Sequence, residues 1–257
     1  MNNEISGILA IWYREFKVFL REKSRIVGSI VNPILWLFIF GGGLGRSVSL
    51  PGVNYQVFIY PGILAQAVLF SSVFYGVYIV WDRKIDFLKE VLVAPISRTS
   101  IFVGKVLGGA TDSTIQAIIL LFLGWLFGRI GFISGLHITP MIFIETLLLL
   151  FLSTTALASV GLIIGSLMES PEGFQLISSF LLFPLFFLSG ALFPINNLPA
   201  WLTPITLADP LTYTVDAIRN VILGSARFAL SFDLGIIAMF TALVIAIGTF
   251  AFEKMKI

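Results

Sequence analysis

The chain has 257 residues, of which 58% are hydrophobic and 12% are charged, with a formal net charge of +2. Soluble domains hold about 25% charged residues, so this composition excludes an ordinary soluble fold and indicates a membrane protein. The absence of cysteine excludes disulfide bonds, thiolate metal sites and a cysteine nucleophile.

The first 25 residues predict an amphipathic helix at the membrane interface, over residues 4–25. Charged residues from Arg14 onward interrupt any signal-peptide core, so we expect the segment to be retained. Apolar residues share one helical face: Ile5, Ile8, Leu9, Trp12, Phe16, Phe19 and Leu20. Basic residues on the opposite face would lie toward anionic headgroups: Arg14, Lys17, Arg21 and Arg25. The alternative is a solvated helix without a partner.

Six apolar stretches are long enough to cross a bilayer, which takes about 20 helical residues. We expect membrane-spanning helices at 26–45, 57–80, 106–128, 142–167, 173–193 and 233–252. The predicted fold is an all-α polytopic membrane protein, a single transmembrane domain over residues 1–257. Most of the 16 Lys and Arg residues precede residue 26, fall within 81–105 or lie in the tail. Both termini and the 81–105 loop should therefore be cytoplasmic.

The loop after the second crossing contains another predicted amphipathic helix, over residues 82–94. Its apolar side would consist of Ile85, Phe87, Leu88, Val91 and Leu92. Its charged side would consist mostly of Asp82, Arg83, Asp86, Lys89 and Glu90. A short amphipathic helix between two crossings fits a groove in a partner protein, although it could instead rest on the bilayer surface.

After the fifth crossing the sequence predicts a re-entrant hairpin and an outer helix, over residues 194–223. Helices usually stop before proline, and three prolines interrupt this stretch: Pro194, Pro199 and Pro204. Asp209 as N-cap and Gly224 after the end predict a helix between them. Asp216 and Arg219 are spaced to pair on that helix.

Two acidic residues interrupt apolar stretches, Asp112 in the third and Glu145 in the fourth. A charge at membrane depth suggests proton coupling or a cation site. Both residues lie near the ends of their helices, which favours packing or interfacial contacts.

Several enzyme classes lack their motifs here. The Gly104–Lys105 pair is followed by Val106, so it is not a phosphate-binding loop. The single histidine, His137, offers no metal cluster, and no nucleophile elbow occurs. We expect no catalytic residue, metal or cofactor on this chain and no nucleic-acid partner. The two halves do not match, which disfavours an ion-gradient secondary transporter.

Two stretches carry a family resemblance: EVLVAPISRTSIFVGKVLGG at 90–109 and LSGALFPINNLPAWLTPITLADPLTYTVDAIR at 188–219. With the six-span plan and the length, they resemble permease subunits of type-2 ABC exporters, closest to the daunorubicin-resistance and nodulation-factor export branch. The resemblance implies a half-transporter in the cytoplasmic membrane. Two permeases, identical or paralogous, would pair with two cytosolic ATPase subunits that bind ATP and magnesium, within membrane lipid.

The implied cargo is a hydrophobic or amphiphilic compound, either a drug or a lipid-like molecule. A lipid-linked glycan is the alternative. Residues 4–25 would form an interface helix against the ATPase, and residues 82–94 would form the coupling helix.

The resemblance also implies roles for individual residues. ATPase coupling would involve Arg83, Asp86, Phe87, Leu88, Glu90 and Leu92. The interface helix would use Trp12, Arg14, Lys17 and Arg21. The translocation path and outer gate would include Phe70, Phe74, Phe183, Phe186, Phe187, Gly190, Pro194 and Pro199. Any single Phe could instead be a lipid-facing or packing aromatic.

Overall fold

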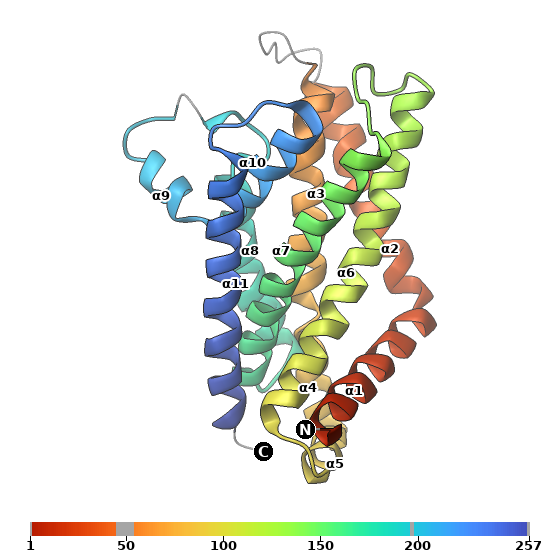
Figure 1. Ribbon diagram of the computed structural model, residues 1–257, viewed down its shortest axis with the longest axis vertical. Helices are drawn as coiled ribbons and strands as arrows, with labels where there is room; N and C mark the ends of the chain where they lie inside the picture. The colour runs from red at the N-terminus through yellow and green to blue at the C-terminus, as the bar shows by residue number, and fades with distance from the viewer. Residues whose placement is uncertain (1, 45–53, 196–197, 256–257) are drawn as a thin grey trace.

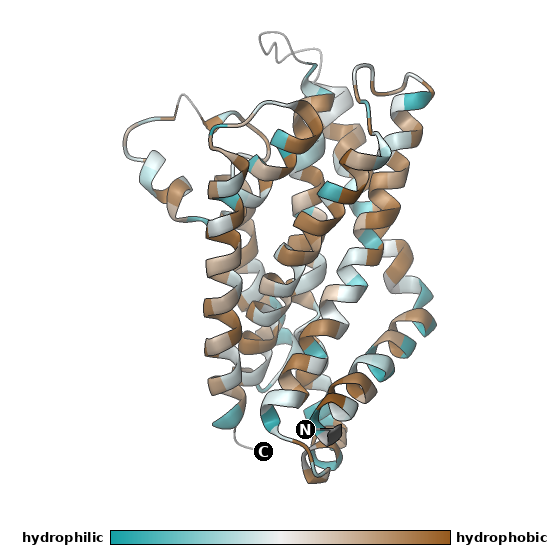
Figure 2. Ribbon diagram, viewed as in Figure 1, coloured by the Kyte–Doolittle hydropathy of each residue, from teal (hydrophilic) through white to brown (hydrophobic). Residues whose placement is uncertain are grey.

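The computed structural model describes residues 2–44, 54–195 and 198–255, and within these ranges the regular structure is helical, without strands (Figure 1). Six helical spans are long and apolar enough to cross a membrane: Ile26–Gly43, Tyr55–Lys84, Arg98–Arg129, Pro140–Leu167, Pro171–Leu188 and Leu230–Glu253. Hydrophobic residues follow the shafts of these helices (Figure 2). The predicted all-α membrane fold is confirmed.

The N-terminal part consists of α1 (Asn2–Arg21), α2 (Lys23–Trp36) and a π-helical continuation, η1 (Leu37–Leu44). The predicted amphipathic helix is present but ends at Arg21, before residue 25. It runs obliquely across one end of the bundle (Figure 1) and packs closely on α6, because Gly104 leaves room for Ile11 there.

The second crossing consists of α3 (Tyr55–Phe74) and α4 (Val77–Lys84), and α5 (Phe87–Val93) follows. The prediction of one helix over 82–94 is therefore wrong. Asp86 has a φ of +58°, in the left-handed region. Such a residue cannot continue a right-handed helix, so α4 and α5 are separate elements.

The remaining spans are α6 (Arg98–Arg129), α7 (Pro140–Leu167), α8 (Pro171–Leu188) and α11 (Leu230–Glu253). Serine or threonine N-caps begin three of them: Ser97, Thr139 and Ser170. The third crossing thus starts earlier than residue 106, which places Lys105 inside a helix. The fifth ends at Leu188, before residue 193.

The core is built around α3 and α4. In the apolar 18-residue stretch of each span, 72% of the second span is buried inside the protein, compared with 22% of the last span. At one point α4 and α7 touch through their backbones, because a Cβ on Gly76 would lie 2.0 Å from the carbonyl oxygen of Gly161. The second span is therefore the central packing element, and the others present wide apolar faces outward.

The end of the bundle opposite the two chain ends carries α9 (Thr203–Ala208) and α10 (Pro210–Leu223) (Figure 1). The predicted cap is confirmed, since the Asp209 carboxylate accepts a hydrogen bond from the Leu211 amide at 2.9 Å. Gly224 follows the helix with a φ of +64°. The re-entrant path of residues 194–208 stays a prediction, and Asn196 and Asn197 lie outside the described residues.

Two arginines hold the segment between α8 and α9. Arg219 donates to the Gly190 carbonyl at 3.0 Å, and Arg227 donates to the Ile195 carbonyl at 2.8 Å. The expected pairing of Asp216 with Arg219 is replaced by other contacts, because Asp216 accepts from the backbone amide of Arg227 at 2.9 Å. This segment is thus anchored to α10 and to the loop after it.

We predict that Gly190→Ala lowers the thermal midpoint more than Gly224→Ala does. Both glycines have positive φ, which costs a non-glycine residue about 1–2 kcal/mol. At Gly190 a Cβ would also lie 2.2 Å from Cγ2 of Ile195, whereas Gly224 has open space around it. Thermal unfolding of both purified variants tests this. Equal losses would show that the contact with Ile195 does not constrain the turn.

Candidate functional site: a buried ion cluster joining α1, α4 and α6

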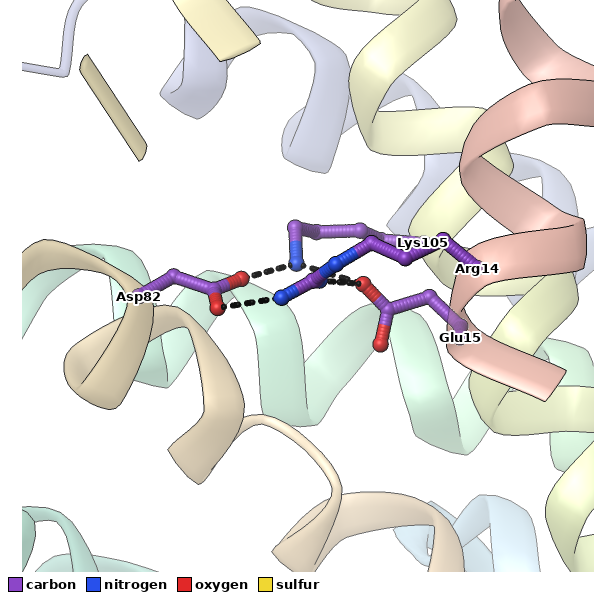
Figure 3. Close-up of polar contacts among 4 residues, drawn as sticks. All are labelled: Arg14, Glu15, Asp82 and Lys105. Atoms are coloured by element: carbon purple, nitrogen blue, oxygen red, sulfur yellow. Dashed lines mark hydrogen bonds and ion pairs between the residues drawn. The ribbon is translucent and has the colours of Figure 1, made fainter. Parts of the chain in front are cut away.

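Four charged side chains meet where α1, α4 and α6 come together (Figure 3). The Lys105 Nζ from α6 donates to Glu15 Oε1 at 3.0 Å and to Asp82 Oδ2 at 2.5 Å. Arg14 donates to Glu15 Oε1 at 2.7 Å and to Asp82 Oδ1 at 3.2 Å. We call Arg14, Glu15, Asp82 and Lys105 the ion cluster.

The ion cluster is balanced in charge and largely removed from solvent. Lys105 is 1% exposed, Glu15 is 3% exposed and Asp82 is 4% exposed. Burial alone raises the pKa of Glu15, but the charges of Lys105 and Arg14 outweigh it and hold the pKa below its ordinary value. Glu15 therefore stays ionised, and the cluster locks three helices together through paired charges.

Contacts from the ion cluster continue into α5. The Arg14 guanidinium lies 3.9 Å from the centre of the Phe87 ring, a cation–π contact. The next residue, Leu88, is buried and belongs to a hydrophobic cluster with Ile79 and Ile101. The short helix α5 is thus fixed both to α1 and to the bundle core.

Hydrogen bonds tie further elements together at this end. Glu4 in α1 accepts from the Ser97 amide at 3.1 Å and from its hydroxyl at 2.9 Å, at the start of α6. Arg98 donates to the carbonyl oxygens of Glu253 at 2.9 Å and Met255 at 3.0 Å, at the end of α11. In Figure 1 this end also carries α5 and both chain ends, opposite α9 and α10.

The outward side of α5 is exposed and mixed in character. The exposed side chains of α5 and of the turn before it are Ile85, Asp86, Lys89, Glu90 and Val93, which we call the α5 face. Ile85 is 66% exposed and Val93 is 85% exposed. The sequence grouped Ile85 with Phe87 and Leu88 on one helical side, which is wrong, because α4 ends before Ile85 and the break at Asp86 separates it from α5.

The predicted coupling residues separate into different environments. Asp86 and Glu90 lie on the α5 face, whereas Leu88 is buried and Phe87 is half-buried. Arg83 lies elsewhere, donating to the carbonyl oxygens of Ser166 at 2.8 Å and Met168 at 3.1 Å. It therefore holds the end of α7. The structure does not describe the Leu92 side chain.

The predicted interface residues also lie in different environments. Lys17 and Arg21 are exposed, as a basic face requires, but Arg14 turns inward to the ion cluster. Trp12 is half-buried and donates from Nε1 to the Thr111 hydroxyl at 2.9 Å. Sequence reasoning missed Glu15, Asp82 and Lys105 as a unit. In the structure Gly108 makes room for Glu15, because a Cβ there would lie 2.7 Å from Cβ of Glu15, but the sequence alone does not show which residue fills that space.

The predicted path aromatics gather between α3 and α8. The Phe70 ring centre lies 5.5 Å from that of Phe183 and 6.5 Å from that of Phe186. Phe74 instead meets Phe174, at 6.5 Å. Phe186 is fully buried, whereas Phe183 is exposed, as are Phe187, Pro194 and Pro199. Whether these residues line a route stays a prediction.

Among the described residues, no group of three or more His, Cys, Asp or Glu side chains is placed to hold a metal ion. Acidic side chains at the ion cluster already have cationic partners from Lys105 and Arg14. The site therefore offers paired charges and an exposed helix, which suits mechanical contact with another protein.

Comparison with known proteins places these features in a family. Nodulation protein J of Rhizobium leguminosarum bv. viciae is 25% identical, over 94% of this chain and 92% of that protein. The putative transport permease ycf38 of Porphyra purpurea is 30% identical, over 84% of this chain and 74% of that protein. The inner membrane transport permease YadH of Escherichia coli K12 is 26% identical, over 91% and 90%. The family described as ABC-2 type transporter matches residues 6–223. The chain therefore belongs to the ABC-2 type transporter family.

Proposed function

We propose that this chain is the permease subunit of an ATP-driven exporter that moves a hydrophobic or amphiphilic compound out across the cytoplasmic membrane. Permeases of this family normally work with an ATPase partner and are typically non-enzymatic. ATP and magnesium would bind to two cytosolic ATPase subunits. Both chain ends and α5 would then lie on the cytoplasmic side, as the basic residues predict.

The observation that carries this proposal is the α5 face. This face of α5 is exposed to solvent, whereas the opposite side of the helix is fixed. Leu88 packs into the core, and Phe87 contacts Arg14 of the ion cluster. A helix free on one side and fixed on the other can transmit a push from a docked partner into α1, α4 and α6. Such a helix fits the groove of a cytosolic ATPase.

The outward side of α8 supports a second permease copy or a paralogue as a partner. It exposes a run of large apolar side chains: Leu176, Ile177, Phe180, Phe183 and Phe187. An apolar face of this kind can pack against lipid or against another helix. Pairing through α8 would put Phe70 and Phe183 close to the axis of a dimer, where cargo would pass.

The test is to purify the chain from its native membrane, identify any ATPase that accompanies it, and reconstitute both in liposomes. We expect no ATP turnover by the chain alone and ATP-dependent export by the complex. Replacing the phosphate-binding lysine of the ATPase partner should abolish turnover. Turnover that persists in that control would mean that this chain hydrolyses ATP, which contradicts the proposal.

A further inference from the structure

A cavity of about 370 Å³ lies between α2, α3, α4 and α6. Its polar wall is formed by Asn32 from α2, Gln66 and Ser71 from α3, Tyr78 from α4 and Gln116 from α6. Gly28 and Asn32 are exposed, so the cavity opens beside α2, on a surface that faces the bilayer. Its volume falls within the range of small-molecule sites, roughly 300 to 1,000 Å³.

Two buried amides in this wall have unused hydrogen-bonding capacity. Gln66 is 4% exposed and Gln116 is 1% exposed. Their side-chain oxygens accept no hydrogen bond from any residue that the structure describes. Burying an amide oxygen without a donor is unfavourable. The arrangement is explained if a bound molecule supplies the donors.

The cavity is also uncharged. Among the described residues that line it, none is Asp, Glu, Lys, Arg or His. The Glu22 carboxylate lies behind the wall and already accepts a hydrogen bond from the Tyr78 hydroxyl. A phosphate group would therefore lose its hydration in the cavity without gaining a counter-charge. Hydroxyl groups and amide N–H groups, by contrast, donate to amide oxygens without carrying charge. The wall therefore selects an uncharged headgroup that donates hydrogen bonds.

An apolar wall completes the cavity. Phe70 and Phe74 line it from α3, and aromatic rings pack well against acyl chains or the apolar face of a sugar. The Phe70 ring also contacts Phe183 and Phe186 of α8. A molecule bound against Phe70 would thus lie on one side of the Phe70 ring, and the exposed Phe183 of α8 contacts that same ring.

We propose that this cavity binds the uncharged, hydrogen-bond-donating headgroup of an amphiphile that enters from the bilayer beside α2. If the amphiphile is cargo, the site is the entry to the export route, and that assignment rests on the proposed function. If it is a resident membrane lipid, the site stands independently of export.

The test uses a photoreactive alkyl glucoside, which carries hydroxyl groups and no charge, on the chain alone in nanodiscs. We expect labelled peptides from α3 and α6, and competition by unlabelled alkyl glucoside. A photoreactive alkyl phosphocholine should not label these peptides. In the double variant Gln66→Leu, Gln116→Leu, labelling should fall at least about tenfold, because two hydrogen bonds are lost.

Gln56→Leu is the matched control, because it makes the same change on α3 outside the cavity and should leave labelling unchanged. The midpoint of thermal unfolding without probe separates binding from folding. Removing two buried amides that lack donors should maintain or raise it. Undiminished labelling in the double variant, or equal labelling by the phosphocholine, would overturn the proposal. A lowered midpoint would assign the amides a structural role and also overturn it.

Adding the ATPase partner with magnesium and ATP distinguishes the two sources of amphiphile. Labelling that falls during turnover supports the site as a step in export, whereas labelling that ATP leaves unchanged supports a resident-lipid site. Because binding is measured on the chain alone, a failure of export leaves the labelling result intact. A failure of labelling likewise leaves the export proposal intact.

Discussion

Replacing Lys105 by methionine is expected to destabilise the protein by about 3–5 kcal/mol, the usual cost of removing one partner from a buried ion pair. Methionine keeps most of the side-chain length but removes the cation between Glu15 and Asp82. Arg14 alone would then balance two buried carboxylates. Thermal unfolding in detergent and abundance in the membrane measure the loss.

The matched control is Lys89→Met, which removes an exposed pair with Asp86 at 2.7 Å. Exposed pairs contribute at most about 1 kcal/mol, so this variant should stay close to wild type. Adding Glu15→Gln to Lys105→Met should restore part of the stability, because it removes one buried negative charge. Similar losses in the two single lysine variants would mean that the ion cluster does not stabilise the fold.

The pH dependence of Lys105→Met gives a readout that simple loss of packing would not produce. In the wild type the lowered pKa of Glu15 contributes stability that is present above the ordinary pKa and is lost as pH falls. Without Lys105, burial should raise the pKa of Glu15, so its cost grows as pH rises. The gap in stability between the two proteins should therefore widen from about pH 5 to about pH 8.

Reversing the charge of Glu90 is expected to have the largest effect on transport. Glu90 lies exposed on the α5 face, where docking of an ATPase would partly bury it. A charge left unpaired in such an interface costs about 1–3 kcal/mol or more, which is roughly 5-fold to 150-fold in affinity. Glu90→Arg should insert normally yet lose export and capture little ATPase during purification.

Glu172→Arg provides the control, since it reverses an exposed acid in the first turn of α8, outside the α5 face. It should retain both export and ATPase capture. If α5 instead rests on the bilayer surface, an added arginine is neutral or mildly favourable on anionic lipid. Full export and full capture by Glu90→Arg would therefore remove the coupling role from α5.

The parts of the fold with local signals could be predicted from sequence. The six apolar spans depend on segment length and composition, and the start of α10 depends on Asp209 capping its own helix. The turn at Asp86 could not be predicted, because helical spacing on either side of it is continuous. Its left-handed backbone accompanies the packing of Leu88 into the core and of Phe87 against Arg14.

The ion cluster illustrates why the site was harder to predict. Lys105 and Glu15 are 90 positions apart in the chain, and the rule that orients membrane helices treats a lysine near a helix end as a loop charge. Only the packing of α1 on α6 reveals that Lys105 faces a carboxylate. Among the aromatics, Phe183 and Phe186 lie on the same helix and both contact Phe70 of α3. Phe186, which also packs edge-on against Trp36 of α2 at 5.5 Å, is the one that is buried.

The backbone contact between Gly76 and Gly161 bears on how movement would travel through the bundle. No layer of side chains separates α4 from α7 there, so no rotamer change can absorb a shift of one helix against the other. Arg83 clamps the same two helices at the end of α7. Helices α4 and α7 would therefore move together as one rigid unit, and α5 follows directly after α4 in the chain. A displacement of α5 should reach the far end of α7 without being damped, and one methyl group added at Gly76, where a Cβ would lie 2.0 Å from the Gly161 carbonyl oxygen, would separate α4 from α7.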